Sequence, residues 1–217
     1  MELYGCVAGP FQTNCWIAVA GKALTVIDPG MGAFATVDGY IKDNGLRLEK
    51  VILTHGHIDH TRDAGSLQQA YDVPVFIHAD DEFMLDDPAA GVSVQAMALH
   101  DADHLVTVDP QARSFFSDGD SITIGGESFA VHHAPGHSPG SVLLVGKTLC
   151  FSGDVLFKGS IGRTDLPRSS WPQMDNTLEN KVWPLDDGLQ ILPGHGPSST
   201  MKSERATNPF LRKFHNR

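Results

Sequence analysis

A short segment of the chain, residues 53–60, concentrates side chains of the types that bind metals. Its candidate ligands are His55, His57, Asp59 and His60. In an extended segment, side chains 55, 57 and 59 would point to one side and side chain 60 to the other. Two ligand sets facing different directions favour a pair of metal ions over a single one. Imidazole and carboxylate without thiolate suit zinc, iron or manganese.

Three further apolar runs end beside a glycine and a residue of a metal-binding type. These residues are His137 after Gly136, Asp154 after Gly153, and His195 after Gly194. Functional side chains of α/β sheets lie in loops beyond strand ends, where glycine lets the backbone turn tightly and approach a ligand. Each such turn alone is ordinary. If all four strand ends meet, five imidazoles and two carboxylates could serve two metals that share a bridging oxygen.

The segments that would position these residues alternate between strand and helix patterns. Strands are predicted over 14–19, 23–27, 50–53, 73–77, 121–124, 128–133, 141–145, 148–151 and 189–192, and helices over 34–44, 61–71, 171–182 and from 203 onward. Residues 86–116 are predicted to form a long loop with one helix, a pattern typical of lids. Each half has several strands and a helix or two, which predicts two packed sheets with helices outside.

Composition narrows the class of protein. A length of 217 residues favours one α/β domain over 1–217, and no apolar run approaches a membrane span. The first residues lack the features of a signal peptide, and three widely spaced cysteines indicate a reduced, cytoplasmic compartment. Cys15 and Cys150 lie in apolar runs and are expected to be inert core residues. A net charge of −10 argues against a nucleic-acid partner. The sequence does not indicate the oligomeric state.

With these motifs in this order, the sequence resembles the metallo-β-lactamase-fold hydrolases. The His-x-His-x-Asp-His signature matches at residues 55–60, and the three later motifs match at His137, Asp154 and His195. The resemblance covers nearly the whole chain. It implies an α/β fold, a four-layer αβ/βα sandwich of two mixed sheets flanked by helices, with the metals at one edge.

The resemblance also implies a role for each ligand. His55, His57 and His137 would hold the first metal, and Asp59, His60 and His195 the second. Asp154 would bridge the two ions together with a hydroxide. Asp59 and Asp154 would be the catalytic carboxylates, with Asp59 also orienting the hydroxide. Two divalent ions are implied, zinc first, with iron or manganese as alternatives.

Within this superfamily the chain most resembles small bacterial glyoxalase II-like proteins. Residues 161–166 are similar to a segment that these proteins share with persulfide dioxygenases, and matches around 14–15, 28–30 and 208–210 extend the similarity. The implied reaction is hydrolysis of a thioester, an S-acyl conjugate of a low-molecular-weight thiol such as S-lactoylglutathione. The separate C-terminal helical domain with which large glyoxalase II enzymes contact glutathione is not expected here. Residues 62–65 replace the usual Gly-Gly, and both departures leave the thiol carrier open.

Several rival functions share this pattern. A persulfide dioxygenase would use one iron held by His55, His137 and Asp154, and a lactone hydrolase would use nearly the same seven ligands. A true β-lactamase is disfavoured because that branch generally lacks the bridging aspartate and many members carry a cysteine ligand. A nuclease of this fold is disfavoured by the net charge. A non-catalytic metal-binding protein is the alternative of a different class, and the intact ligand set argues against it.

A few residues outside the ligand set could also act in the site. Arg163 and Lys158 could grip a carboxylate of the thiol carrier, or be ordinary surface charges. Asp28, in an Asp-Pro-Gly turn, could orient a ligand histidine, although turn chemistry explains it equally well. His100 and His104 are expected to be surface residues.

Overall fold

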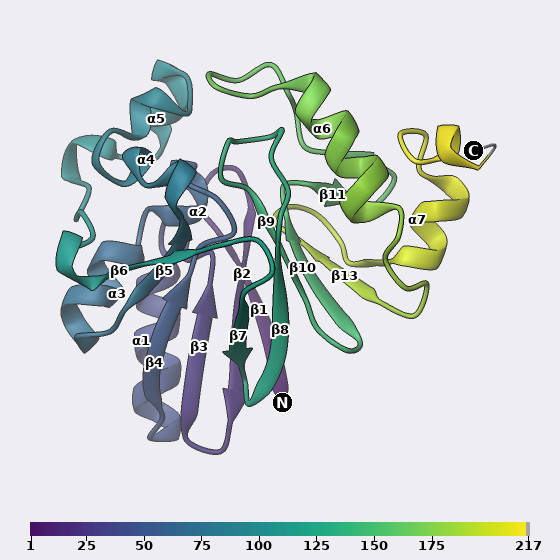
Figure 1. Ribbon diagram of the computed structural model, residues 1–217. Helices are drawn as coiled ribbons and strands as arrows, with labels where there is room; N and C mark the ends of the chain where they lie inside the picture. Colours follow the sequence, from purple (N-terminus) through teal and green to yellow (C-terminus); the bar gives the residue numbers. More distant parts are fainter. Residues whose placement is uncertain (216–217) are drawn as a thin grey trace.

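Two six-stranded sheets form the centre of the molecule (Figure 1), in a computed structural model that describes residues 1–215. The first sheet has the order β1-β2-β3-β4-β5-β6, with β1 (Glu2–Ala8), β2 (Thr13–Ala20), β3 (Ala23–Ile27), β4 (Arg47–Ile52), β5 (Val75–His78) and β6 (Arg113–Phe116). The second has the order β14-β13-β10-β9-β8-β7, with β7 (Ser121–Ile124), β8 (Glu127–His133), β9 (Val142–Val145), β10 (Leu149–Gly153), β13 (Gln190–Pro193) and β14 (Ser199–Thr200). Both sheets are mixed, since β3 to β6 are parallel neighbours, as are β10 and β13. A small hairpin of β11 (Leu156–Phe157) and β12 (Ser160–Ile161) lies apart from both.

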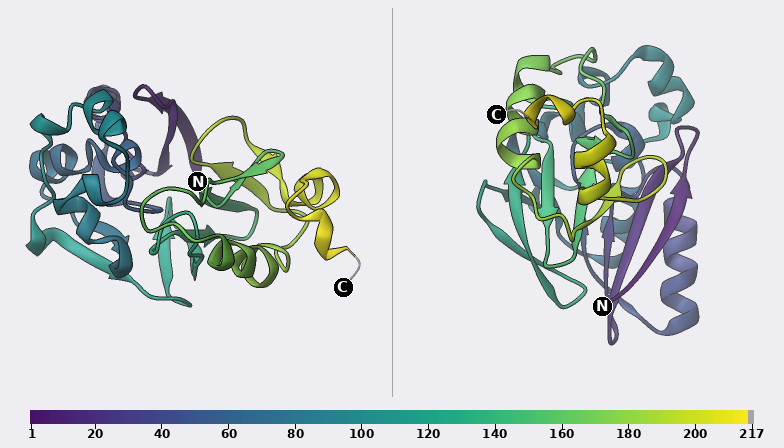
Figure 2. Two further views of the ribbon diagram at one scale, coloured as in Figure 1. Left: turned by 90° about the horizontal axis from the view of Figure 1, so that it is seen from above. Right: turned by 90° about the vertical axis from the view of Figure 1, so that its right-hand side faces the viewer.

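Helices cover the outer faces of the two sheets, as the views of Figure 2 show. The α-helices are α1 (Ala33–Asn44), α2 (Ile58–Thr61), α3 (Ala64–Tyr71), α4 (Phe83–Asp86), α5 (Val94–Leu99), α6 (Trp171–Thr177) and α7 (Met201–Thr207). Short turns of other helix types are η1 (Ala79–Asp81), η2 (Pro88–Ala90), η3 (Ala102–His104), η4 (Pro110–Ala112), η5 (Leu178–Val182) and η6 (Arg212–Phe214). No helix of the described chain is both long enough and apolar enough to cross a membrane.

The layered arrangement follows from the alternating direction of side chains along each strand. In β4, Val51 faces α1 and α3, whereas Ile52 faces the other sheet. In β10, Cys150 packs under α6 and α7, whereas Phe151 faces the first sheet. Successive strand side chains point to opposite faces, so strands covered on both faces need continuous apolar runs. The predicted four-layer sandwich is therefore confirmed.

A buried carboxylate ties the loops of the two sheets together. Asp81 follows β5 and accepts hydrogen bonds from the Gly56 amide (2.9 Å), the Ser138 hydroxyl (2.6 Å) and the Gly140 amide (2.6 Å). The first donor belongs to the loop after β4 and the other two to the loop between β8 and β9. Burial raises the pKa of Asp81, and these three hydrogen bonds oppose that rise. The side chain thus fixes two candidate ligand loops relative to each other.

Several local predictions from the sequence were wrong. The helix predicted over 61–71 begins only at Ala64, as α3, because Thr61 is the last residue of α2. Between the two helices, the Asp63 side chain accepts a hydrogen bond from the Phe34 amide (2.9 Å). Strand β1 was not predicted, since it is exposed along most of its length. The segment 86–116 ends in strand β6, where Arg113 makes a bidentate pair with Asp86 at 2.9 and 2.5 Å. These elements depend on partners that are distant in the sequence.

Replacing Asp81 by alanine tests its role in joining the sheets. We expect Asp81→Ala to lower the free energy of unfolding by about 2–3 kcal/mol, because three donors lose a charged acceptor. The matched control is Asp80→Ala, whose side chain is 56% exposed, and it should change stability by less than about 0.5 kcal/mol. Urea unfolding of both variants measures the difference. Equal values for the two would contradict the assignment.

Candidate metal centre

Four strand ends bring the seven predicted ligands to one place at the edge between the sheets. The loop after β4 supplies residues 55 and 57, and the loop after β8 supplies His137. The ends of β10 and β13 supply Asp154 and His195. All are buried except His195, whose side chain is 25% exposed. The sequence places them there because each strand ends in a tight, glycine-containing turn.

The polypeptide around Asp59 and His60 is helical, which corrects the simple extended interpretation of residues 55–60. His57 has extended backbone angles and is the cap of α2, which begins at Ile58. Asp59 and His60 therefore project from the first turn of a helix, while His55 and His57 project from the loop before it. This change of backbone direction separates the two pairs of side chains.

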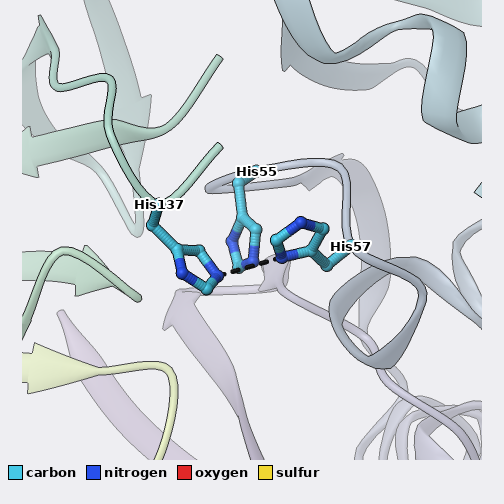
Figure 3. A group of neighbouring side chains, drawn as sticks. All are labelled: His55, His57 and His137. Carbon is cyan, nitrogen blue, oxygen red and sulfur yellow. Dashed lines mark hydrogen bonds between the residues drawn. The ribbon is translucent and has the colours of Figure 1, made fainter. Parts of the chain in front are cut away.

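Three imidazoles form the first group. Figure 3 shows His55, His57 and His137 pointing toward one another, with His57 Nδ1 and His137 Nε2 at 2.9 Å. One ligand atom from each of the three lies within 4.8 Å of the others. The ring of His55 lies edge-on to both neighbours, with centroids at 4.8 and 4.9 Å. The three rings therefore converge on one point.

The second group combines a carboxylate with two imidazoles. His195 Nε2 lies 3.1 Å from Asp59 Oδ2 and 3.2 Å from His60 Nε2. His60 Nε2 lies 3.4 Å from the same Asp59 oxygen. Atoms bound to one zinc at about 2.0–2.1 Å would be roughly 3.3 Å apart in a tetrahedron. The observed spacing suits a metal ion.

Asp154 lies between the two groups. Its Oδ1 is 3.4 Å from His60 Nε2, and its Oδ2 is 3.4 Å from both His137 Nε2 and His195 Nε2. A carboxylate has two oxygens that can serve different ions. Asp154 is therefore placed to contact both groups at once.

Hydrogen bonds at the far side of each ring fix which nitrogen faces the centre. His60 Nδ1 donates to Asp28 (3.0 Å), His137 Nδ1 to the Arg163 carbonyl (2.9 Å) and His195 Nδ1 to the Phe11 carbonyl (2.9 Å). Carboxylates and carbonyls only accept, so each Nδ1 carries a proton, and Nε2 is the nitrogen that faces the centre and can hold a proton or a metal ion there. Such outer partners orient ligand histidines in metal sites.

Asp28 also acts on a second histidine. Its two oxygens accept from the Thr54 amide and the Thr54 hydroxyl, each at 2.7 Å. The Thr54 hydroxyl, having donated, lies 3.1 Å from His55 Nδ1 and can accept from it. One carboxylate thus orients His55 through Thr54 and His60 directly.

The protein environment sets opposite charge states within the cluster. Burial, together with the neighbouring imidazole of His137, lowers the pKa of His57 to about 3. Burial raises the pKa of Asp154, yet nearby imidazoles outweigh it and lower that pKa to about 2. Burial opposes charge on His195, but hydrogen bonds to Asp154 and Asp59 raise its pKa to about 11. The carboxylates thus demand a cation beside them, either a proton or a metal ion.

Unsatisfied polar atoms support a metal more directly. Among the described residues of this centre, His55 Nε2 and Asp154 Oδ1 are buried without a hydrogen-bond partner. Buried polar atoms are rarely left unpaired, and a missing ion is one explanation when they are. Close backbone approach is also built in, since a Cβ at Gly194 would lie 2.2 Å from Asp154 Oδ1 and 2.5 Å from His60 Cε1. The residues present therefore fit a dinuclear metal site.

A pocket of about 440 Å³ opens over this centre. Its walls are largely apolar, with Phe11, Val92, Ala96, Phe157, Ile161 and Leu166 among the lining residues. Two of these belong to the predicted lid segment 86–116. Arg163 lines the same pocket, but its guanidinium is paired with Asp165 at 2.7 and 2.8 Å. Lys158 lines a different cavity, beside Gln190 and Ser199.

Several residues with a place in the site were missed from the sequence. The Phe11 and Arg163 carbonyls act through the backbone, so residue type gives no signal for them. Thr13 donates to Asp59 Oδ2 at 3.2 Å from the β1–β2 hairpin. His100 was expected at the surface and is instead fully buried, with its ring against Phe11 at 4.7 Å. Its burial follows from the lid segment folding over the pocket.

A fourth group of metal-binding residue types lies outside the pocket. It consists of His78, Asp80 and His133. The two imidazoles stack in parallel at 3.9 Å, so their in-plane lone pairs do not converge on one point. Side-chain direction thus distinguishes this group from the centre.

Comparisons with known proteins agree with this geometry. The sequence profile of the Metallo-beta-lactamase superfamily matches residues 8–195. The chain is 34% identical to the hydroxyacylglutathione hydrolase GloC of Haemophilus influenzae, over 93% of each protein. The structure of the BLEG-1 B3 metallo-beta-lactamase is similar with a TM-score of 0.85 and 34% identity, over 97% of this chain and 99% of that one. The structure of TTHA1623 in a di-iron-bound form has a TM-score of 0.81 and 32% identity, over 96% and 100%.

Asp28 allows a test of how the histidines are oriented. Asp28→Asn replaces one acceptor oxygen by a donor, and asparagine tolerates the left-handed backbone found here (φ 54°). We expect metal affinity to fall about 10–100-fold, as when an outer partner of a ligand is lost. Competition with a chromophoric chelator measures this, and Asp43→Asn, at an exposed position, is the control. Unchanged affinity in Asp28→Asn would refute the orienting role.

Proposed function

The chain belongs to the metallo-β-lactamase superfamily, and we propose that it is a glyoxalase II-like enzyme that hydrolyses a thioester of a low-molecular-weight thiol. The observation that carries this proposal is the convergence of seven side chains of metal-binding types, five of which line one pocket. The relative of similar length that is named a hydroxyacylglutathione hydrolase supports the substrate class. Ligands come from both halves, so we treat residues 1–217 as one catalytic domain. We place the reaction in the cytoplasm, where such thiols are kept reduced.

We assign the ligands in two sets. His55, His57 and His137 would hold one ion, and Asp59, His60 and His195 the other, with Asp154 shared. Zinc fits this donor set, and the di-iron form of a similar protein makes iron an equal candidate. When bound, the ions would lower the pKa of a water molecule to about 7 and polarise the substrate carbonyl.

The protein side chains would position the reactants. The apolar walls would exclude water from the acyl thioester and hold its carbonyl over the centre. Asp59, whose pKa stays below its usual range because imidazoles outweigh the effect of burial, would accept a hydrogen bond from the attacking water. The products are a carboxylic acid and a free thiol. Thiols are far more acidic than alcohols, so the departing sulfur needs no proton donor from the chain.

Hydrolysis of a β-lactam is the second candidate, because one of the similar structures carries the name of a B3 metallo-beta-lactamase. A lactam and a thioester both present a carbonyl that water attacks. The two differ in the leaving group, because an amide nitrogen needs a proton and a thiolate does not. The thioester is favoured here because its thiolate leaving group needs no general acid in the apolar pocket.

A direct assay separates these candidates. We expect the purified protein to contain about two metal ions per chain and to hydrolyse S-lactoylglutathione, with activity lost on chelation and restored by the metal. Asp154→Ala should lower kcat/KM by about 100-fold or more, because both ions lose a shared ligand. Elemental analysis and loss of thioester absorbance are the measurements. Turnover of a β-lactam without turnover of thioesters would favour the second candidate, and full activity of Asp154→Ala would refute the shared ligand.

Arg163 offers a test of the thiol carrier. If its guanidinium binds a carboxylate of the carrier, Arg163→Ala should raise KM for S-lactoylglutathione by about tenfold, the size of a charge-assisted hydrogen bond of about 1.4 kcal/mol. The same variant should leave KM unchanged for a thioester of an uncharged thiol. Asp165→Ala frees the guanidinium from its partner and should lower KM for the glutathione conjugate. If neither substitution alters the preference between the two thioesters, Arg163 does not bind the carrier.

A further inference from the structure

Two cysteines face each other across the first hairpin of the chain. Strands β1 and β2 pair in antiparallel register with Cys6 directly opposite Cys15. Directly opposed residues of an antiparallel pair have side chains on the same face of the sheet. Cys15 is fully buried in the core under α1 and α3, and Cys6 packs against that core while remaining partly exposed. Of the two thiols, Cys6 is thus the one that solvent can reach.

We propose that Cys6 and Cys15 form a reversible disulfide that controls the metal centre. Opposed residues in a sheet have Cβ atoms about 4.5–5.5 Å apart, whereas a disulfide needs about 3.5–4.5 Å. The bond is therefore within reach but draws the two strands together. A disulfide with one sulfur exposed to solvent is easily reduced, which is typical of regulatory pairs and not of structural ones.

The two thiols differ in the way that exchange chemistry requires. The neighbouring Cys15 thiol lowers the pKa of Cys6, although partial burial opposes this. The same contact and burial raise the pKa of Cys15. The thiolate is the nucleophile in thiol–disulfide exchange, so the partly exposed thiol with the lowered pKa attacks first. Cys6 is thus the attacking residue and Cys15 the resolving one.

The oxidant is a low-molecular-weight disulfide, written RSSR. The Cys6 thiolate attacks one sulfur, so that a Cys6–SR bond forms, the RS–SR bond breaks and one RSH leaves. The Cys15 sulfur then attacks Cys6, and the second RSH leaves. Two cysteine protons go to two RSH molecules, and two electrons pass from the pair to RSSR. A reducing thiol reverses both steps.

The hairpin connects this pair to the metal centre. The Phe11 carbonyl orients His195, and the Thr13 hydroxyl donates to Asp59. The Asn14 amide donates to the Gly194 carbonyl at 2.7 Å, and the Asn14 side chain donates to the Pro193 carbonyl at 3.0 Å. All three hairpin residues lie within four positions of Cys15. Drawing β1 and β2 together therefore shifts the groups that hold Asp59 and His195.

The test uses the full, metal-loaded chain equilibrated in buffers of oxidised and reduced glutathione, followed by alkylation of free thiols and mass spectrometry. We expect two of the three cysteines to become protected, with a mass lower by about 2 Da because two hydrogens leave. Dithiothreitol should restore all three thiols. Cys6→Ser should abolish the effect, and Cys150→Ser, which alters a buried cysteine of the other sheet, should not. A stable glutathione adduct on Cys6 without an internal bond, or three free thiols throughout, would overturn the proposal.

A second measurement tests the connection to the metals without relying on the proposed hydrolysis. Metal retention against a chelator should fall about tenfold in oxidised wild-type protein, as when an outer partner of a ligand is disturbed. Oxidised Cys6→Ser should retain its metals like the reduced protein. Thioester turnover, which does rest on the proposed function, should fall in parallel. If the disulfide forms while metal retention is unchanged, the pair does not control the centre.

Discussion

The need to balance two buried carboxylates governs the arrangement of this molecule. Asp59 and Asp154 lie almost completely out of solvent, where an isolated charge is very costly. Imidazoles surround the two carboxylates and offset this cost. The second nitrogen of three of these rings donates a hydrogen bond to Asp28 or to a backbone carbonyl. Each ring can then offer only a lone pair or accept a proton toward the centre. A cation between these groups is the natural completion of that arrangement.

Contacts between loops of both sheets hold the candidate metal centre together. Asp81 joins the loop after β4 to the loop after β8, and the β1–β2 hairpin contacts the loop after β13. These contacts place ligands of the first sheet and ligands of the second sheet within hydrogen-bond distance. The lid segment and the hairpin close the same pocket from the other side, through Phe11 and His100. Rigidity of the ligands and shape of the pocket thus come from the same few loops.

The side chains that carry the chemistry of the site could be predicted from the sequence much better than the contacts that hold them in position. His55, His57, Asp59 and His60 are recognisable because their types and spacing are unusual together, and the strands before them have simple apolar patterns. The break between α2 and α3 was not predicted, and the hydrogen bond that Asp63 accepts there comes from Phe34, a partner distant in the sequence. The role of the Phe11 and Arg163 carbonyls could not be predicted either, since every residue has a backbone carbonyl. The facing of Cys6 and Cys15 depends on the hairpin register, and the apolar run around Cys15 predicted only an inert core residue.

The division of ligands between the two sheets has a consequence for synthesis of the chain. The first sheet alone supplies His55, His57, Asp59 and His60, and the ribosome makes it first. Until the second sheet emerges, the nascent chain lacks His137, Asp154 and His195, and the inner face with Ile27 and Ile52 has no covering layer. At that stage the chain holds only four of the seven candidate ligands. The complete set of seven side chains exists only once the second sheet has docked on the first.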